Sequence, residues 1–368
     1  MPAISRAPRR RAPRARCARG ARRIDAMRTN RRTVGVALLA ALLSAVAGCG
    51  GGAAGGAAEL RIPLGAGGVG FLPLYVMRDR ALVEKHAQAA GLTNLTVRWI
   101  ELGGPAVMND ALLSGSVDFI AAGPPAFITL WDRTRGSADV RGVAAMSSLP
   151  MYLNTTNPAL ATIDELTDTD KIAVTAVKVS IPSIVMQMYA AERYGAAEAF
   201  RFDRYTVTMT HADALIALLS GGNQINAHFT SPPFHQREIR DPRVRTVLDT
   251  DEVMGGATTF TMLSTTARFR EQNPAAYAAV LAALEEANEL IRSDPRAAAE
   301  VLFAAESAAG FSVDEIVEVL ADPDIRFTTT PENVAKYAEF MHEIGSIENR
   351  PSSWRDMFFP EIHAAPGS

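Results

Sequence analysis

The residues of this sequence that could bind a small charged molecule gather in the short segment from Lys178 to Ser183. Lys178 supplies an ammonium group, and Ser180 and Ser183 supply hydroxyls where an apolar helical pattern begins. The amino end of a helix carries free N–H groups and the positive end of the helix dipole, so it attracts anions. The segment therefore predicts an anion-binding loop, and the alternative is that Lys178 is a solvated surface lysine.

A glycine-rich stretch after a short apolar strand is the second candidate. Gly65, Gly67 and Gly70 have the bare G-x-G-x-x-G spacing of a dinucleotide-binding loop. That spacing alone is weak support, and Pro73 in the following helical turn suits a loop for a short ligand as well as a pyrophosphate site. Nucleotide binding is the minor alternative for this loop.

Motifs for catalysis are absent from the sequence. It has no H-E-x-x-H zinc motif, no Walker phosphate loop and no defensible Ser-His-Asp order. If the chain starts at Met27 and not at Met1, Cys49 is its only cysteine, and neither a disulfide nor a cysteine metal site can form. For His211 and His228 we expect a structural role, because a lone histidine near a strand is more often a satisfied buried group. We expect no enzymatic activity, no cofactor and no metal.

Two similar stretches organise the chain and must position these residues. Residues 109–127 read NDALLSGSVDFIAAGPPAF, and residues 213–234 read DALIALLSGGNQINAHFTSPPF. In each, a helical pattern ends at a glycine, Gly115 or Gly221, which suits the left-handed residue that closes a helix. A strand follows, starting at Val117 in the first copy, and runs into a proline pair that cannot continue a ladder. Two copies predict two similar α/β lobes, whose proline loops face each other across a cleft because ligands sit at the carboxyl ends of parallel strands.

The remaining pattern predicts the boundaries of helices and lobes. Residues 73–87 read as one helix, Pro105 opens another, and residues 330–345 form the last, while Ser312 and Glu315 form a capping box. The chain is predicted to cross between lobes at residues 147–152 and 254–256. The predicted domains are an upstream extension and signal peptide at 1–48, a Gly/Ala tether at 49–59, a first lobe at 60–150 and 255–368, and a second lobe at 151–254.

The formal net charge of −3 hides a strong asymmetry along the 368 residues. Twelve of the 37 lysines and arginines lie between Arg6 and Arg32, and from Cys49 onward 25 of these cations face 39 acids. Binding to nucleic acid requires clustered cations that neutralise phosphates. The acidic body therefore excludes nucleic acid as an expected partner.

A secretion signal precedes the acidic body. Three arginines, Arg28, Arg31 and Arg32, come before an apolar run at 34–46, which is shorter than the roughly 20 residues of a membrane span. The small residues before Cys49 resemble the lipobox of bacterial lipoproteins. We therefore expect export, lipidation of Cys49 and anchoring to the outside of the cell membrane. A buried helix is the alternative, and a twin-arginine export route is only weakly matched.

With these residues in view, the sequence resembles the substrate-binding proteins of ABC importers for alkanesulfonates, taurine and nitrate, a family that also includes the thiamine-pyrimidine type. The resemblance spans about residues 60–363 and is carried by GVGFLPLYVMRDRALVEKH, LLSGSVDFIAAGPP, LATIDELTDTDKIAV, LLSGGNQINAHFTSPPF, FREQNPAAYAAVLAALEEANELI and PSSWRDMFFPEIH. It implies a type II periplasmic-binding-protein fold, two α/β lobes joined by two hinge crossings with a small ligand between them. It also implies a monomer that delivers its ligand to a membrane permease and its ATPase.

The resemblance also implies which residues contact the ligand. Carried over motif by motif, they are Gly70, Phe71, Gly104, Gly123, Pro124, Lys178, Ser180, Ser183 and Ser231. Sulfonate, nitrate, small carboxylate and neutral pyrimidine all stay open as ligands. The alternatives for function are an enzyme related to the thiamine-pyrimidine synthases and a sensory binding protein that reports to a receptor.

Overall fold

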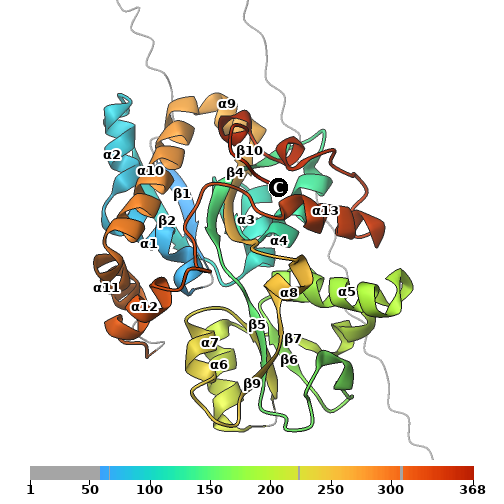
Figure 1. Cartoon of the computed structure of the whole chain (residues 1–368). Coiled ribbons are helices and arrows are strands. Elements are labelled where there is room, and N and C mark those ends of the chain that lie inside the picture. Colours follow the sequence, from blue (N-terminus) through green and yellow to red (C-terminus); the bar gives the residue numbers. More distant parts are fainter. Residues whose placement is uncertain (1–58, 66, 223, 307–309) are drawn as a thin grey trace, which may run out of the picture. The chain divides into compact units, whose positions relative to one another are not determined.

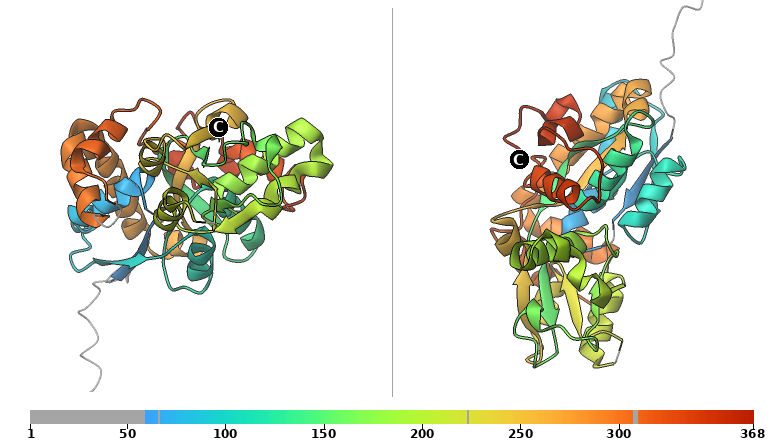
Figure 2. Two further views of the ribbon diagram at one scale, coloured as in Figure 1. Left: turned by 90° about the horizontal axis from the view of Figure 1, so that it is seen from below. Right: turned by 90° about the vertical axis from the view of Figure 1, so that its right-hand side faces the viewer.

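The computed structural model of the chain describes residues 59–65, 67–222, 224–306 and 310–368. The predicted signal peptide, the tether and Cys49 lie outside these residues. The described residues belong to one compact unit, and its strands form three sheets (Figures 1 and 2). Within the described part of the chain, no helix combines the length and the apolar character needed to cross a membrane.

The first lobe contains two of the sheets. One pairs β1 with β2 in parallel, and in the other β10 lies between β3 and β4 and runs antiparallel to both. These strands are β1 (Glu59–Leu64), β2 (Thr96–Glu101), β3 (Ile120–Ala122), β4 (Val140–Ser148) and β10 (Thr259–Thr266).

The second lobe contains one five-stranded sheet of order β7-β6-β8-β5-β9. Strand β6 runs parallel to β7 and β8, whereas β5 runs antiparallel to β8 and β9. The strands are β5 (Tyr152–Thr155), β6 (Ile172–Val174), β7 (Thr206–Thr208), β8 (Ala227–Thr230) and β9 (Arg245–Asp249).

Two crossings join the lobes. The chain leaves the first lobe where β4 ends at Ser148 and enters the second at Tyr152, and it returns through α8 (Thr250–Met254) to β10. The crossings are tied together where Ser147 and Thr261, 2.7 Å apart through their hydroxyls, both donate to the carbonyl of Gly70. The predicted fold class, two α/β lobes joined by two crossings, is confirmed.

Helices cover the sheets of both lobes. In the first lobe α10 packs on α1 and α2, and α11 packs on α12, whereas α13 packs on α4 (Figure 1). The helices of the first lobe are α1 (Leu72–Asp79), α2 (Leu82–Ala89), α3 (Pro105–Leu113), α4 (Pro124–Thr134), α9 (Ala267–Gln272), α10 (Pro274–Ser293), α11 (Pro295–Ala305), α12 (Val313–Leu320) and α13 (Val334–Glu343). Those of the second lobe are α5 (Ile181–Tyr194), α6 (His211–Ser220) and α7 (Phe234–Glu238), with the 3-10 segment η3 (Ala196–Tyr205) against α5.

Most predicted helix signals are confirmed. Gly115 and Gly221 both adopt the left-handed conformation after their helices, with φ of 71°, and Ser312 and Glu315 form the capping box of α12. Pro105 opens α3.

Four predicted boundaries are wrong. The helix expected at 73–87 is two helices, because Ala81 takes a left-handed conformation with φ of 47° between α1 and α2. The first proline pair is not a loop. Pro124 is the first residue of α4, a position that tolerates proline because its N–H would have no partner in the helix, and the strand before it starts at Ile120 and not at Val117. The last helix begins at Val334, where Asn333 is left-handed.

Candidate ligand-binding cleft

A narrow cavity of about 40 Å³ lies between residues of the two lobes. A single water needs about 10–15 Å³ of such space, so the closed cleft has room for only a few water-sized groups. The first lobe contributes Phe71, Pro105, Met108, Ala121, Ala122, Gly123, Phe260 and Thr261, and the second contributes Met151, Thr175, Val179, Ser180, Ile181, Pro182 and His211. No lysine or arginine is among the described residues that line it.

Four helices begin at this cavity. Pro105 is the first residue of α3, Gly123 precedes α4, Ser180 precedes α5, and His211 is the first residue of α6. The four helices are 9, 11, 14 and 10 residues long, so each has a full first turn. The prolines in these turns, Pro105, Pro124, Pro125 and Pro182, have no N–H. The amides of Ser183 and Asp213 are bonded to capping hydroxyls, so the other amides of the first turns are the ones that can donate to a ligand. The cleft therefore lies at the positive ends of four helix dipoles.

The loop before α5 is held by its own hydroxyls. Ser180 accepts a hydrogen bond from the amide of Ser183 at 3.4 Å, which caps the helix. The hydroxyl of Ser183 accepts from the amide of Lys178 at 3.1 Å and donates to the carbonyl of Ala176 at 3.2 Å. Lys178 itself has a left-handed φ of 70°. Ser180 therefore lies in the lining of the cavity, and the hydrogen bonds of Ser183 hold the loop in this conformation.

Lys178 lies beside this loop, but its side chain is not part of the lining that the structure describes. Burial raises the pKa of Asp203, and the charge of Lys178 acts in the opposite direction on that carboxyl. Asp203 belongs to η3, and it also accepts from the amide of Gln187 at 2.9 Å. The charge of Lys178 therefore acts on Asp203 in η3, which packs against α5.

Some of the predicted contact residues line the cavity and the others lie next to it or behind it. Phe71, Gly123 and Ser180 line the cavity. Gly104 and Pro124 are the direct chain neighbours of lining residues, and Ser183 and Ser231 are buried. A Cβ on Gly70 would lie 2.2 Å from the ring of Phe260, so this glycine is a packing position behind the cavity wall.

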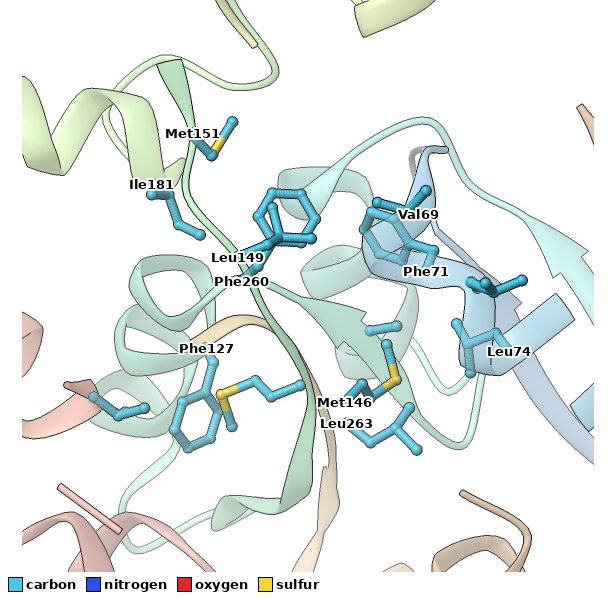
Figure 3. Close-up of a cluster of buried hydrophobic side chains, with 14 of the residues drawn as sticks. Val69, Phe71, Leu74, Phe127, Met146, Leu149, Met151, Ile181, Phe260 and Leu263 are labelled. Atoms are coloured by element: carbon cyan, nitrogen blue, oxygen red, sulfur yellow. The ribbon is translucent and has the colours of Figure 1, made fainter. Parts of the chain in front are cut away.

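Apolar side chains close the cavity on the crossing side. The ring of Phe71 meets that of Phe260 edge to face at 6.0 Å and 72°. Figure 3 shows Phe260 and Leu149 with Ile181 and Met151 on one side and Phe71 on the other. Side chains from the two lobes thus meet in one apolar layer.

Two protein side chains contact the glycine loop closely. A Cβ on Gly65 would lie 1.7 Å from the ring of Phe71, which covers the loop. The amide of Gly68 donates to both carboxyl oxygens of Glu306, at 2.9 and 3.0 Å. A phosphate would need that N–H group, so the loop is not arranged for a nucleotide.

A buried polar chain that sequence reasoning missed starts at the cleft. Nδ1 of His211 lies 2.9 Å from Nε2 of His228, and Nδ1 of His228 lies 2.5 Å from Oε1 of Glu238. The other carboxyl oxygen of Glu238 accepts from the amide of Asn154 at 2.9 Å. These residues come from α6, β8, α7 and β5, and no spacing in the sequence signals that they meet.

The fold and the cleft together define the periplasmic-binding-protein class of structure. The alkanesulfonate-binding protein SsuA from Xanthomonas axonopodis pv. citri, bound to MOPS, is similar over 80% of this chain and 96% of its own, with a TM-score of 0.61 and 18% identity. The aliphatic sulphonate binding protein SsuA from Escherichia coli matches over 82% and 92%, with a TM-score of 0.57 and 20% identity.

The periplasmic nitrate-binding protein NrtA from Synechocystis PCC 6803 is also similar, over 81% of this chain and 83% of its own, with a TM-score of 0.57 and 15% identity. No protein-family profile and no curated protein sequence matches the chain. The likeness is therefore one of fold.

Proposed function

We propose that this protein is the solute-binding component of an ABC importer and that it captures a small anion between its lobes. The observation that carries the proposal is the convergence of four helix amino ends on one cavity lined from both lobes. Solved structures of the same fold that bind sulfonates and nitrate support it.

Helix amino ends and hydroxyls, and not a lysine or an arginine, would hold the anion. Free N–H groups and dipoles at helix amino ends bind anions without a lysine or an arginine. Thr175 and Ser180 carry further hydroxyls in the lining, whereas the hydroxyl of Thr261 already donates to the carbonyl of Gly70. A cavity of about 40 Å³ favours a compact anion such as nitrate or methanesulfonate, and a larger ligand requires the lobes to separate.

A thermal-shift screen of the full-length protein tests the ligand class. The panel contains nitrate, methanesulfonate, taurine, acetate and a neutral pyrimidine. A ligand at a hundred times its dissociation constant adds about 2.7 kcal/mol to the free energy of unfolding, so binding raises the melting temperature. Stabilisation by the pyrimidine without any by the anions would contradict the anionic class, and no stabilisation by any of them would contradict solute capture.

The proposal includes export and lipid anchoring through Cys49, supported by the sequence before it. Cys49→Ala is expected to release the protein from the membrane fraction, because the lipid is attached to that thiol. Mass spectrometry of the membrane-bound protein checks it. A mature chain that retains residues before Cys49 would show that no lipoprotein processing occurs.

A further inference from the structure

Three titratable side chains form a continuous hydrogen-bonded chain from the cleft into the second lobe. His211 lines the cavity, His228 follows behind it, and Glu238 ends the chain. Their exposed fractions are 2%, 1% and 0%. Because all three are buried, a proton added to this chain changes whether His211 donates or accepts a hydrogen bond toward the cavity.

The partners of Glu238 set the direction of the hydrogen bonds. The amide of Asn154 donates to one carboxyl oxygen, and an ionised carboxylate accepts at the other as well. His228 then donates from Nδ1 and accepts at Nε2, so His211 donates from Nδ1. In that state Nε2 of His211, the ring nitrogen left for the cavity, is a hydrogen-bond acceptor.

One additional proton converts Nε2 of His211 from a hydrogen-bond acceptor into a donor. Protonation of His211 at Nε2 makes it a donor toward the cavity. The Nδ1 proton of His211 can then move to Nε2 of His228, which places the positive charge against Glu238 and leaves His211 neutral with Nε2–H. The net charge of the three groups changes from −1 to 0, and the cavity now presents a donor where it presented an acceptor.

We propose that the cleft takes up one proton together with its anion and that the His211–His228–Glu238 chain holds this proton. The inference rests on the proposed function, since it deepens what the same cleft binds. An anion cannot accept a hydrogen bond from an imidazole lone pair, and no lysine or arginine in the described lining supplies the charge. The proton converts the one titratable group of that lining into a partner for the anion.

The surroundings of His211 disfavour its protonated form in the free protein. Burial and the neighbouring His228 hold the pKa of His211 well below its ordinary value. Nδ1 of His235 lies 3.1 Å from the side-chain amide nitrogen of Asn154. Burial lowers the pKa of His235, and the charge of Asp322 acts in the opposite direction.

Other charged groups on α7 are engaged elsewhere. Arg237 and Arg240 pair with Glu315 at the surface. An anion beside Nε2 favours the form that carries the additional proton, so affinity is expected to rise by up to tenfold for each unit by which pH falls over the range in which binding takes up that proton.

Calorimetry on the full-length protein tests the inference with nitrate and methanesulfonate between pH 5 and pH 8.5. Both remain anionic throughout, so any dependence on pH belongs to the protein. Titrations in buffers of different ionisation enthalpy are expected to count about one proton taken up per anion. Dimethyl sulfone, the neutral counterpart of methanesulfonate, is expected to show no proton uptake.

Two variants and a control assign the proton to this chain. His211→Gln keeps a polar side chain at the cavity but cannot take up a proton, so its proton count is expected to fall to zero. Glu238→Gln removes the counter-charge and is expected to shift the pH midpoint of affinity to lower pH. His86→Gln is the control, since His86 pairs with Glu286 at 2.8 Å on the α2–α10 surface, and its proton count should stay at one.

Imidazole nitrogen NMR of the wild-type protein provides a second measurement if a variant does not fold. Nε2 of His211 is expected to be unprotonated in the free protein at pH 7 and protonated in the anion complex. Anion binding with no proton uptake, or an unchanged Nε2 signal, would overturn this inference and leave the proposed function standing. Failure of both anions to bind at pH 5 would overturn the two together.

Discussion

At the residue scale, the lining of the cleft offers hydroxyls and one histidine, and Lys178 is not part of that lining. Ser180 lines the cavity and caps α5. Lys178 adjoins the same loop, yet only its backbone amide is bound to the loop, through Ser183. Substitutions of Ser180 and Lys178 therefore test, one at a time, whether a hydroxyl or an ammonium group contacts the anion.

Replacing these residues one at a time distinguishes their contributions. Ser180→Ala is expected to weaken binding of nitrate or methanesulfonate by roughly tenfold, because a hydrogen bond to a charged group contributes about 1.5 kcal/mol. It should also lower the free energy of unfolding by about 1 kcal/mol through the lost helix cap. Lys178→Met is expected to change affinity by less than about threefold. A loss of ten- to a hundredfold for Lys178→Met in calorimetry would place the ammonium group at the anion.

His235 predicts a dependence of stability on pH. Burial lowers the pKa of His235 from 6.5 to about 4, and its ring stacks on Tyr152 at 3.7 Å. Between these values the unfolded chain binds more protons, so the stabilisation is complete above pH 6.5 and is lost as pH falls toward 4. The loss is about 3 kcal/mol. His235→Phe keeps the stack, and chemical denaturation should show a shallower decline for it over that range than for wild type. Equal declines would show that His235 titrates normally.

At the element scale, the start of α4 in one lobe lies against the start of α5 in the other. A Cβ on Gly123 would lie 2.9 Å from the side chain of Ile181 and 3.2 Å from the carbonyl of Phe260. The glycine has an ordinary φ of −72°, so space, and not backbone strain, requires it. The close approach of these helices depends on the missing methyl group.

Gly123→Ala is therefore expected to hold the lobes apart. Overpacking of a tight contact costs about 1–3 kcal/mol, and separation of the lobes relieves it, so affinity should fall about tenfold while the melting temperature of the free protein changes little. Calorimetry and thermal unfolding measure the two effects.

Gly104→Ala is the matched control for this substitution. Gly104 precedes α3, and its Cβ would lie 3.5 Å from the carbonyl of Thr175, an ordinary contact. Affinity is expected to stay within about threefold of wild type. If both variants bind as tightly as wild type, the α4–α5 contact does not govern closure.

At the scale of the whole described unit, a second set of contacts joins the lobes beside the cleft. Phe234 of α7 packs edge to face on Phe311 at 5.5 Å. Arg237 and Arg240 of the same helix pair with Glu315 of α12, whose pKa is lowered to about 2 by the backbone of Ser312 and by Arg240. Exposed ion pairs contribute only about 0.2–1 kcal/mol, so these contacts bias closure without locking it.

Ligand binding is expected to favour the closed arrangement. Within the residues that the structure describes, two crossings connect the lobes, which permits rigid-body rotation about them. Small-angle scattering of the full-length protein should show a smaller radius of gyration with saturating nitrate or methanesulfonate than without. Glu315→Gln should enlarge the radius of the free protein and leave that of the complex unchanged. An identical radius with and without a bound anion would indicate a rigid cleft.

Much of the architecture could be predicted from local pattern. Gly115 and Gly221 mark helix ends, and Pro105 and the Ser312–Glu315 capping box mark helix starts, because each acts through its own backbone or its neighbours within a turn. The proline pair at 124 was misread because the same residue that stops a strand also opens a helix.

The sequence by itself determined the two-lobed α/β organisation and three of the residues that line the cleft, Phe71, Gly123 and Ser180. The tertiary structure decided that Lys178 is outside the described lining and that His211 meets His228 and Glu238. The reason is physical. A helix cap depends on residues a few positions apart, whereas a buried hydrogen-bonded chain depends on the packing of β8, α6 and α7, which no local spacing encodes.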